Sequence, residues 1–151
     1  MTEDRTEHKK AIYWICVLAL FIAAFANAVR AGSAGAIKTA LLDPINAQHS
    51  GEMIGNVLGN SFLGFALSLL VISPLLDRFG AKRVILFAAV CFVAGPLLTL
   101  LASHSADYGS MQTMLNAGMV LWGFGWGATE GSINPLATTI YPDDKTGKLN
   151  S

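Results

Sequence analysis

Four long uncharged segments dominate the pattern of hydrophobic and polar positions along the chain. They cover residues 11–29, 53–76, 84–106 and 108–129. Each segment approaches or exceeds the roughly 20 residues that an α-helix needs to cross a hydrocarbon layer about 30 Å thick. The pattern therefore predicts an all-α membrane protein in which residues 11–142 form the transmembrane region. We expect its four transmembrane helices at about residues 11–42, 53–76, 84–103 and 111–140.

The basic residues gather at three of the positions that flank these segments. They lie before the first segment, after the second and after the fourth: Arg5, Lys9, Lys10, Arg78, Lys82, Arg83, Lys145 and Lys148. The positive-inside rule then places residues 1–10, the loop after the second helix and residues 143–151 in the cytoplasm. We expect a multi-pass protein of the plasma (inner) membrane. A cleaved signal peptide is the alternative for the first segment, but it would leave an odd number of crossings.

The composition narrows the class of protein further. Apolar residues make up 53% of the 151 residues and charged residues 13%, against roughly 25% charged in a soluble domain. The net charge is zero, and both cysteines lie inside apolar segments. The three histidines show no paired ligand spacing, and no nucleophile lies in a catalytic motif. We therefore expect no enzyme, metal site, cofactor or nucleic-acid partner, and we expect the lipid bilayer as the main surrounding.

Glycines recur at helical spacing in two of the predicted helices. Gly51, Gly55 and Gly59 are four residues apart and are followed by Gly64. Such a ridge lets a neighbouring helix approach closely. The fourth helix is also rich in glycine, so we expect close packing there as well.

Glu130 is the one acidic residue within the fourth predicted helix, with 22 uncharged residues before it. An acid at membrane depth costs at least about 2.5 kcal/mol, so it is expected to face a cavity or a partner. Trp122, Trp126 and Asn134 fall at four-residue spacing on the same broad face. Aromatic rings beside a carboxylate and an amide suit a sugar. The alternatives are a structural ion pair for Glu130 and packing anchors for the tryptophans.

The loop after the second helix is the other candidate for function. Asp77 stands at the membrane edge beside several cations, and Gly80 permits a tight turn. A carboxylate in this position can cap a neighbouring helix or pair with a base, and so act as a conformational latch. The sequence Asp77-Arg78-x-Gly80 with Lys82-Arg83 resembles the signature loop of the major facilitator superfamily. That resemblance implies a latch role for Asp77, Arg78 and Gly80.

The end of the fourth helix sharpens this resemblance. Glu130, Asn134-Pro135 and Leu149-Asn150 resemble the fucose:proton symporter-like branch of the superfamily. The resemblance implies proton-coupled symport of a sugar, with Glu130 in substrate binding or proton coupling and Asn134 in the cavity. It also implies that the chain corresponds to the first four helices of an N-terminal six-helix half, so that the remaining helices of a longer transporter would complete it.

The first helix departs from that branch, whose members use a carboxylate there. This chain instead carries Asn27 and Arg30. Arginine cannot carry a proton, but it can bind an anionic group or hold Glu130 ionised. Helical geometry places Arg30 and Glu130 at different depths, so a direct pair between them is not expected. An Arg30 that binds an anionic group instead would make an acidic substrate the alternative to a neutral sugar. The alternative from another class is a small tetraspan scaffold or assembly protein without transport activity, in which both residues join helices together.

Overall fold

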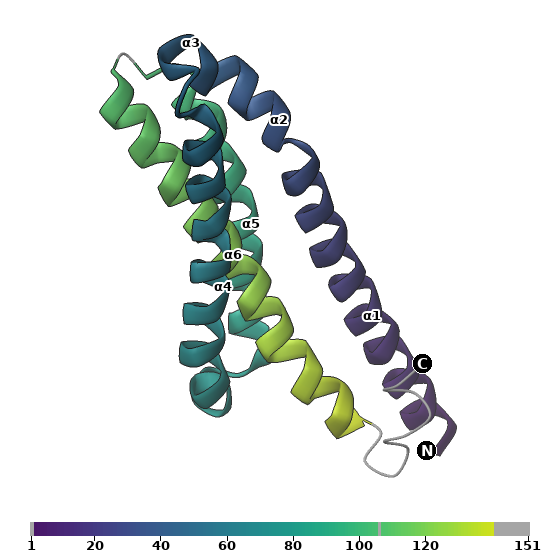
Figure 1. Cartoon of the computed structure of the whole chain (residues 1–151). Coiled ribbons are helices and arrows are strands. Elements are labelled where there is room, and N and C mark those ends of the chain that lie inside the picture. Colours follow the sequence, from purple (N-terminus) through teal and green to yellow (C-terminus); the bar gives the residue numbers. More distant parts are fainter. Residues whose placement is uncertain (1, 106, 141–151) are drawn as a thin grey trace.

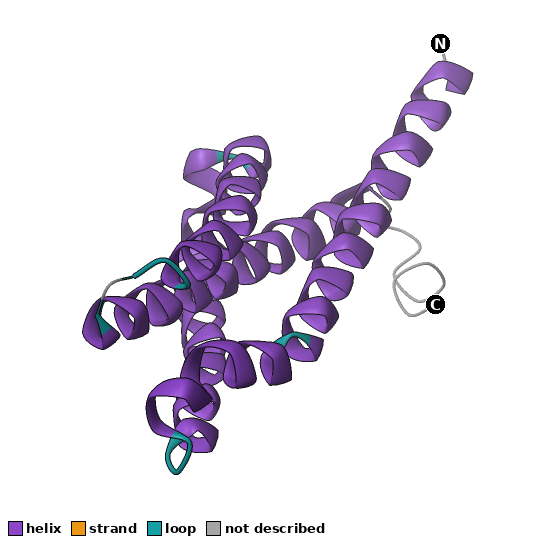
Figure 2. Ribbon diagram, turned by 90° about the horizontal axis from the view of Figure 1, so that it is seen from above, coloured by secondary structure: helices purple, strands orange, loops and turns teal. Residues whose placement is uncertain are grey.

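The computed structural model describes residues 2–105 and 107–140, and every regular element in these ranges is a helix (Figures 1 and 2). The elements are α1 (Thr2–Gly32), α2 (Ala34–Ile37), the π-helix η1 (Lys38–Leu42), α3 (Asp43–Asn46), α4 (Ser50–Phe79), α5 (Ala81–Ala102) and α6 (Tyr108–Ile140). The predicted all-α class is confirmed for this part of the chain. The expected cytoplasmic segment 143–151 and the Leu149-Asn150 motif lie outside the described residues.

Within residues 2–105 and 107–140, three helical segments are long and apolar enough to cross a membrane: Glu7–Asn46, Ser50–Phe79 and Ala81–Ala102. The 33-residue α6 is long enough, but its glycines and polar residues keep it out of this set. It can be less apolar because α4, α5 and part of α1 pack around it. The fourth crossing and the cytoplasmic position of both termini therefore stay predictions.

The first membrane segment extends beyond its predicted bounds of 11–42 at both ends. The helical path is interrupted at Ser33, becomes a π-helix at Lys38–Leu42 and continues to Asn46. Pro44 does not stop it, because it lies in the first turn of α3, where a missing N–H is tolerated. Lys38 Nζ also donates to Asp43 Oδ1 at 2.8 Å across this junction. The geometry of this segment thus changes at Ser33 and again at Lys38–Leu42.

α6 forms the centre of the packing. It runs along both α4 and α5, which contact each other far less, and it meets α1 near its own C-terminal end. A buried cluster joins η1, α4, α5 and α6: Leu42, Ile54, Val57, Ala102, Met111, Leu115 and Met119. A smaller cluster of Cys16, Ile133 and Ile140 joins α1 to α6. Figure 1 shows α1 leaning away from the other helices between these two contacts.

Close packing uses the glycines of α6 rather than the predicted ridge at the start of α4. A Cβ atom at Gly123 would meet the backbone of Ser61, and one at Gly127 would lie 2.6 Å from Phe65 O. On α4, Gly64 meets the backbone of Val120. The expected close packing is thus confirmed at Gly64, whereas a Cβ at Gly51, Gly55 or Gly59 meets no atom of the described residues within 4 Å. These three glycines lie on the face of α4 that is turned away from α6.

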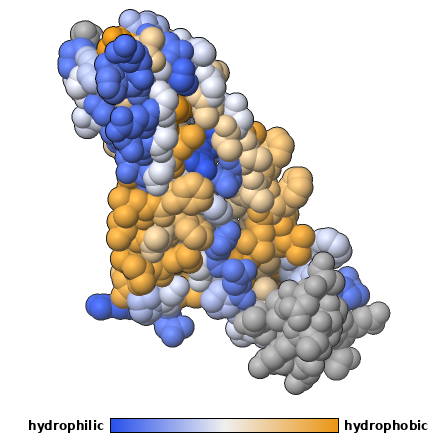
Figure 3. All heavy atoms as spheres, viewed as in Figure 1, coloured by the Kyte–Doolittle hydropathy of each residue, from blue (hydrophilic) through white to orange (hydrophobic). Residues whose placement is uncertain are grey.

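The exterior matches what a membrane requires. Large hydrophobic side chains are widely exposed, including Trp14 and Phe21 on α1 (both 66%) and Leu70 on α4 (73%). Figure 3 shows hydrophobic surface over the middle of the molecule and hydrophilic surface at the end that carries α3. Water would penalise so much apolar exposure, whereas lipid does not. The start of α1, the α4–α5 turn and the end of α6 lie at the same end of the molecule (Figure 1).

Candidate functional site

Arg30 is a buried cation that joins α1 to α4. Its side chain is only 5% exposed. The guanidinium Nε donates to Asn27 Oδ1 at 3.0 Å, and Nη1 donates to Leu58 O at 3.3 Å and to the Ser61 hydroxyl. Its Cζ atom also lies 5.4 Å from the centroid of the Phe62 ring, in cation–π range. Among the described residues, the guanidinium of Arg30 therefore contacts only neutral partners.

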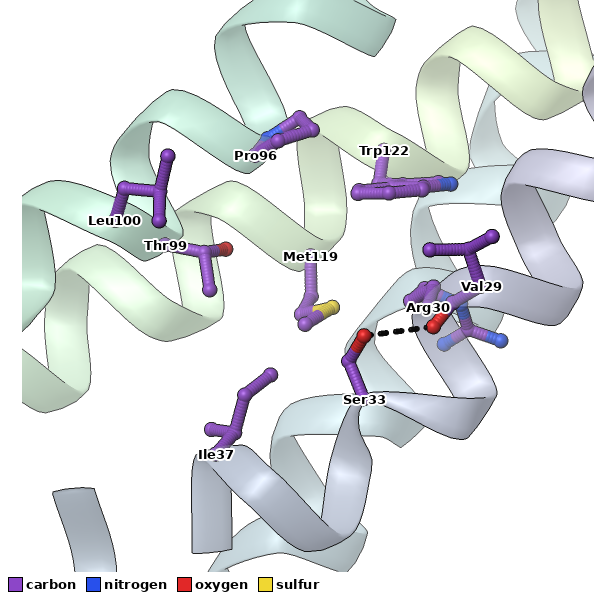
Figure 4. Close-up of a pocket in the computed structure, with 9 residues that line it drawn as sticks. All are labelled: Val29, Arg30, Ser33, Ile37, Pro96, Thr99, Leu100, Met119 and Trp122. Carbon is purple, nitrogen blue, oxygen red and sulfur yellow. Dashed lines mark hydrogen bonds between the residues drawn. The ribbon is translucent and has the colours of Figure 1, made fainter. Parts of the chain in front are cut away.

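A cavity of about 280 Å³ adjoins Arg30 between α1 and the α5–α6 pair (Figure 4). Its lining is mainly apolar and includes Met119, Trp122, Pro96 and Leu100. Figure 4 shows the Trp122 indole nitrogen and the Arg30 guanidinium on the Val29 side of the view. The Trp122 Nε1 atom is buried and has no hydrogen-bond partner in the described part of the chain. The cavity thus combines an apolar wall with a charged residue, Arg30, and the Trp122 ring, whose Nε1 atom is buried beside it.

Glu130 lies in a second polar position, beside an aromatic cluster. Trp126 Nε1 donates to Glu130 Oε1 at 2.6 Å, one helical turn apart on α6. The Trp126 ring packs on Phe65, with 4.3 Å between centroids, and meets Phe62 edge-on at 6.0 Å. Glu130 itself is half-buried. The hydrogen bond and the rings on α4 fix the orientation of the indole and aim its N–H at the carboxylate.

Phe62 links the two positions. One of its neighbours is the Arg30 guanidinium and the other is the Trp126 ring. Arg30 and Glu130 themselves form no ion pair; the salt bridges among the described residues are Lys10–Glu7 and Lys38–Asp43. The cation and the acid are therefore connected through the contact between Phe62 and Trp126, not through a direct ion pair.

The predicted residues do not all gather in one place. Asn27 is half-buried and serves as an acceptor for Arg30, whereas Asn134 is exposed beyond Glu130. Trp122 meets Phe92 of α5 at 6.4 Å rather than the rings around Trp126. The structure thus divides the candidate face of α6 into an Arg30 side with Trp122 and a Glu130 side with Trp126.

The candidate latch is a one-residue turn between α4 and α5. Gly80 has φ of +76° and ψ of 147°, a conformation that residues with a Cβ rarely adopt. Asp77, Arg78, Lys82 and Arg83 are all exposed. Asp77 borders a groove of about 320 Å³ shared with Ser132 and Thr139 of α6. The turn holds its charges at the edge of the helix bundle, where another element can reach them.

Sequence reasoning missed the α4 residues of this site, which are Leu58, Ser61, Phe62 and Phe65. Ser61 and Ser68 are buried polar residues in an apolar segment, seven residues apart, and that spacing was the available signal. Ser68 Oγ donates to Phe124 O of α6 at 2.9 Å. The described residues contain no cluster of three or more acidic, histidine or cysteine side chains that could hold a metal ion.

Comparison with known proteins gives one match. Residues 16–151 match the family described as Major Facilitator Superfamily. No curated protein and no solved structure matches the chain.

Proposed function

The chain belongs to the Major Facilitator Superfamily, and we propose that it forms part of a secondary transporter that moves a sugar together with a proton across the plasma membrane. Family membership makes the chain a multi-pass membrane protein with a transporter role. It also favours transport over the alternative of a tetraspan scaffold. The specificity for a sugar, the coupling to a proton and the location in the plasma membrane are our proposal.

The observation that carries the proposal is the hydrogen bond from Trp126 to Glu130 inside an aromatic cluster. A carboxylate at membrane depth is a functional candidate, and its usual roles include proton relay. Indole and phenyl rings offer flat apolar faces to the C–H side of a sugar, while the carboxylate accepts from its hydroxyls. In this proposal Glu130 alternates between the ionised form, which accepts from Trp126, and a protonated form.

The remaining residues of the site have supporting roles in this proposal. Asn134 lies one turn beyond Glu130 on α6, where its exposed side chain offers an amide to the substrate. Asp77, Arg78, Gly80, Lys82 and Arg83 form the latch, which exchanges contacts as the transporter changes conformation. Helices in addition to α1–α6 would complete the transport path in the full-length protein.

The test is a Glu130→Gln variant of the full-length protein in liposomes, with D-glucose, D-galactose and L-fucose as labelled probes. We expect accumulation driven by a proton gradient to be lost, because glutamine cannot exchange a proton, while exchange of sugar at equal concentrations continues. Glu52→Gln is the matched control, since Glu52 is an exposed acid at the start of α4. Proton-driven accumulation that survives in Glu130→Gln would remove Glu130 from the coupling step.

A further inference from the structure

The charge of Arg30 is uncompensated in the part of the chain that the structure describes. Its partners Asn27, Leu58 O and Ser61 are neutral, and no carboxylate of the described residues lies within ion-pair distance. Buried charges in proteins are normally paired, and a charge within a membrane segment usually marks a substrate or ion site. A reversibly bound anion would compensate the charge of Arg30.

Donor capacity remains at Arg30 after its internal contacts are made. Nε and Nη1 are engaged, whereas Nη2 has no hydrogen bond among the described residues. Trp122 Nε1 is a buried donor without a partner in the described part of the chain, and Trp122 lines the same cavity as Arg30. Leaving a buried donor such as Trp122 Nε1 unpaired is unfavourable, and a ligand oxygen would give Arg30 Nη2 the acceptor that it has among none of the described residues.

The cavity indicates the kind of molecule that carries this oxygen. Its volume of about 280 Å³ is near the lower end of sites for small organic ligands, and its walls are mainly apolar. A hydrated inorganic anion would gain little from Met119, Pro96 and the Trp122 ring. An organic body with one anionic group fits both parts of the cavity.

We propose that this cavity binds the carboxylate of an acidic sugar, with Arg30 as the charged donor and Trp122 Nε1 as a second donor. The inference rests on the proposed sugar transport and names the class of sugar. Guanidinium groups recognise carboxylates through parallel N–H bonds, so arginine is suited to this role where a neutral donor is not. Phe62 holds the guanidinium plane from one side.

The experiment compares two matched pairs of probes, D-glucose with D-glucuronate and D-galactose with D-galacturonate. The members of each pair differ only in the oxidation state of C6. We expect the full-length protein in liposomes to accumulate at least one acid about tenfold or more above its neutral partner. Arg30→Gln should reduce that preference about tenfold or more, and Arg30→Lys should reduce it less, because lysine keeps the charge but not the planar donors.

Lys9→Gln serves as the control, because Lys9 is an exposed cation near the start of α1. Accumulation of the neutral sugars but not of the acids would overturn this inference and leave the proposed function standing. A preference for the acid that persists in a folded Arg30→Gln variant would also overturn it. Accumulation of neither member of either pair, and of no L-fucose, would contradict the proposed function itself. If Arg30→Gln does not fold, the inference is tested by the acid-over-neutral preference of the wild type and of Arg30→Lys. An equal preference in these two proteins would then overturn it.

Discussion

Trp126 Nε1 and Glu130 Oε1 are joined by a hydrogen bond of 2.6 Å across one turn of α6. Two phenylalanines of α4 hold the indole ring, so the donor is fixed while the acid lies at the edge of the cluster. The ionised form of Glu130 therefore accepts a hydrogen bond from a neutral donor. Among the described residues no cation forms an ion pair with it, which would favour the ionised form more strongly. The pair is therefore suited to a group that changes its charge during transport.

Replacing Trp126 by phenylalanine removes the donor and keeps an aromatic ring against Phe65. Hydrogen bonds to charged groups contribute about 1.5–3 kcal/mol, so we expect the initial rate of proton-driven sugar uptake to fall roughly tenfold or more. Trp14→Phe on the exposed face of α1 is the control. Equal uptake by the two variants in liposomes would show that this hydrogen bond has no part in transport.

The glycines of α6 and α4 give opposite predictions for the same substitution. In Gly127→Ala the new Cβ would lie 2.6 Å from Phe65 O and 2.7 Å from Ser68 Cβ. Overpacking of this kind typically costs about 1–3 kcal/mol, so the melting temperature in detergent should fall. In Gly55→Ala the Cβ meets nothing within 4 Å, and alanine is the better helix former by roughly 0.5–1 kcal/mol.

Thermal unfolding of the two purified variants checks this contrast. A drop in the melting temperature for Gly55→Ala as large as that for Gly127→Ala would mean that a neighbour covers the glycine face of α4 in the intact protein. No drop for Gly127→Ala would contradict the close approach of α4 and α6.

Asp107 caps the start of α6 in a pH-dependent way. Its Oδ1 atom accepts from the backbone N–H groups of Gly109 at 2.8 Å and Ser110 at 3.1 Å. Hydrogen bonds from the side chain and then the backbone of Ser110 hold the pKa of Asp107 below its ordinary value. The lowered pKa means that the ionised form is favoured by folding. The cap is thus fully present above the ordinary pKa and is lost as the pH falls through the lowered one.

We expect hydrogen exchange at the Gly109 and Ser110 amides to accelerate, relative to its intrinsic rate, as the pH falls below about 4. Asp107→Ala should show the faster exchange at every pH, whereas Asp107→Asn should retain protection that no longer depends on pH, because an amide oxygen still accepts. Equal protection in wild type and Asp107→Ala would show that the cap does not stabilise the helix start.

The sequence by itself determined the features that depend on neighbours along the chain. Uncharged segments of about 20 residues predicted the long helices, because a backbone without water must form its hydrogen bonds internally. A spacing of four residues between Trp126 and Glu130 places them on one helical face, and the structure has the corresponding hydrogen bond. Gly80 at the α4–α5 turn likewise has the positive φ that a tight turn calls for.

Only the tertiary structure decided which helix faces meet. The partners of Arg30 on α4 are 28 and 31 residues away along the chain, and no local pattern identifies them. Gly55 and Gly127 are both glycines in apolar helices, yet one meets nothing within 4 Å and the other touches a backbone. Helical periodicity defines a face but not its neighbour, because the neighbour depends on how several helices share the space around α6. For the same reason Trp122 and Trp126, one turn apart, belong to different parts of the site.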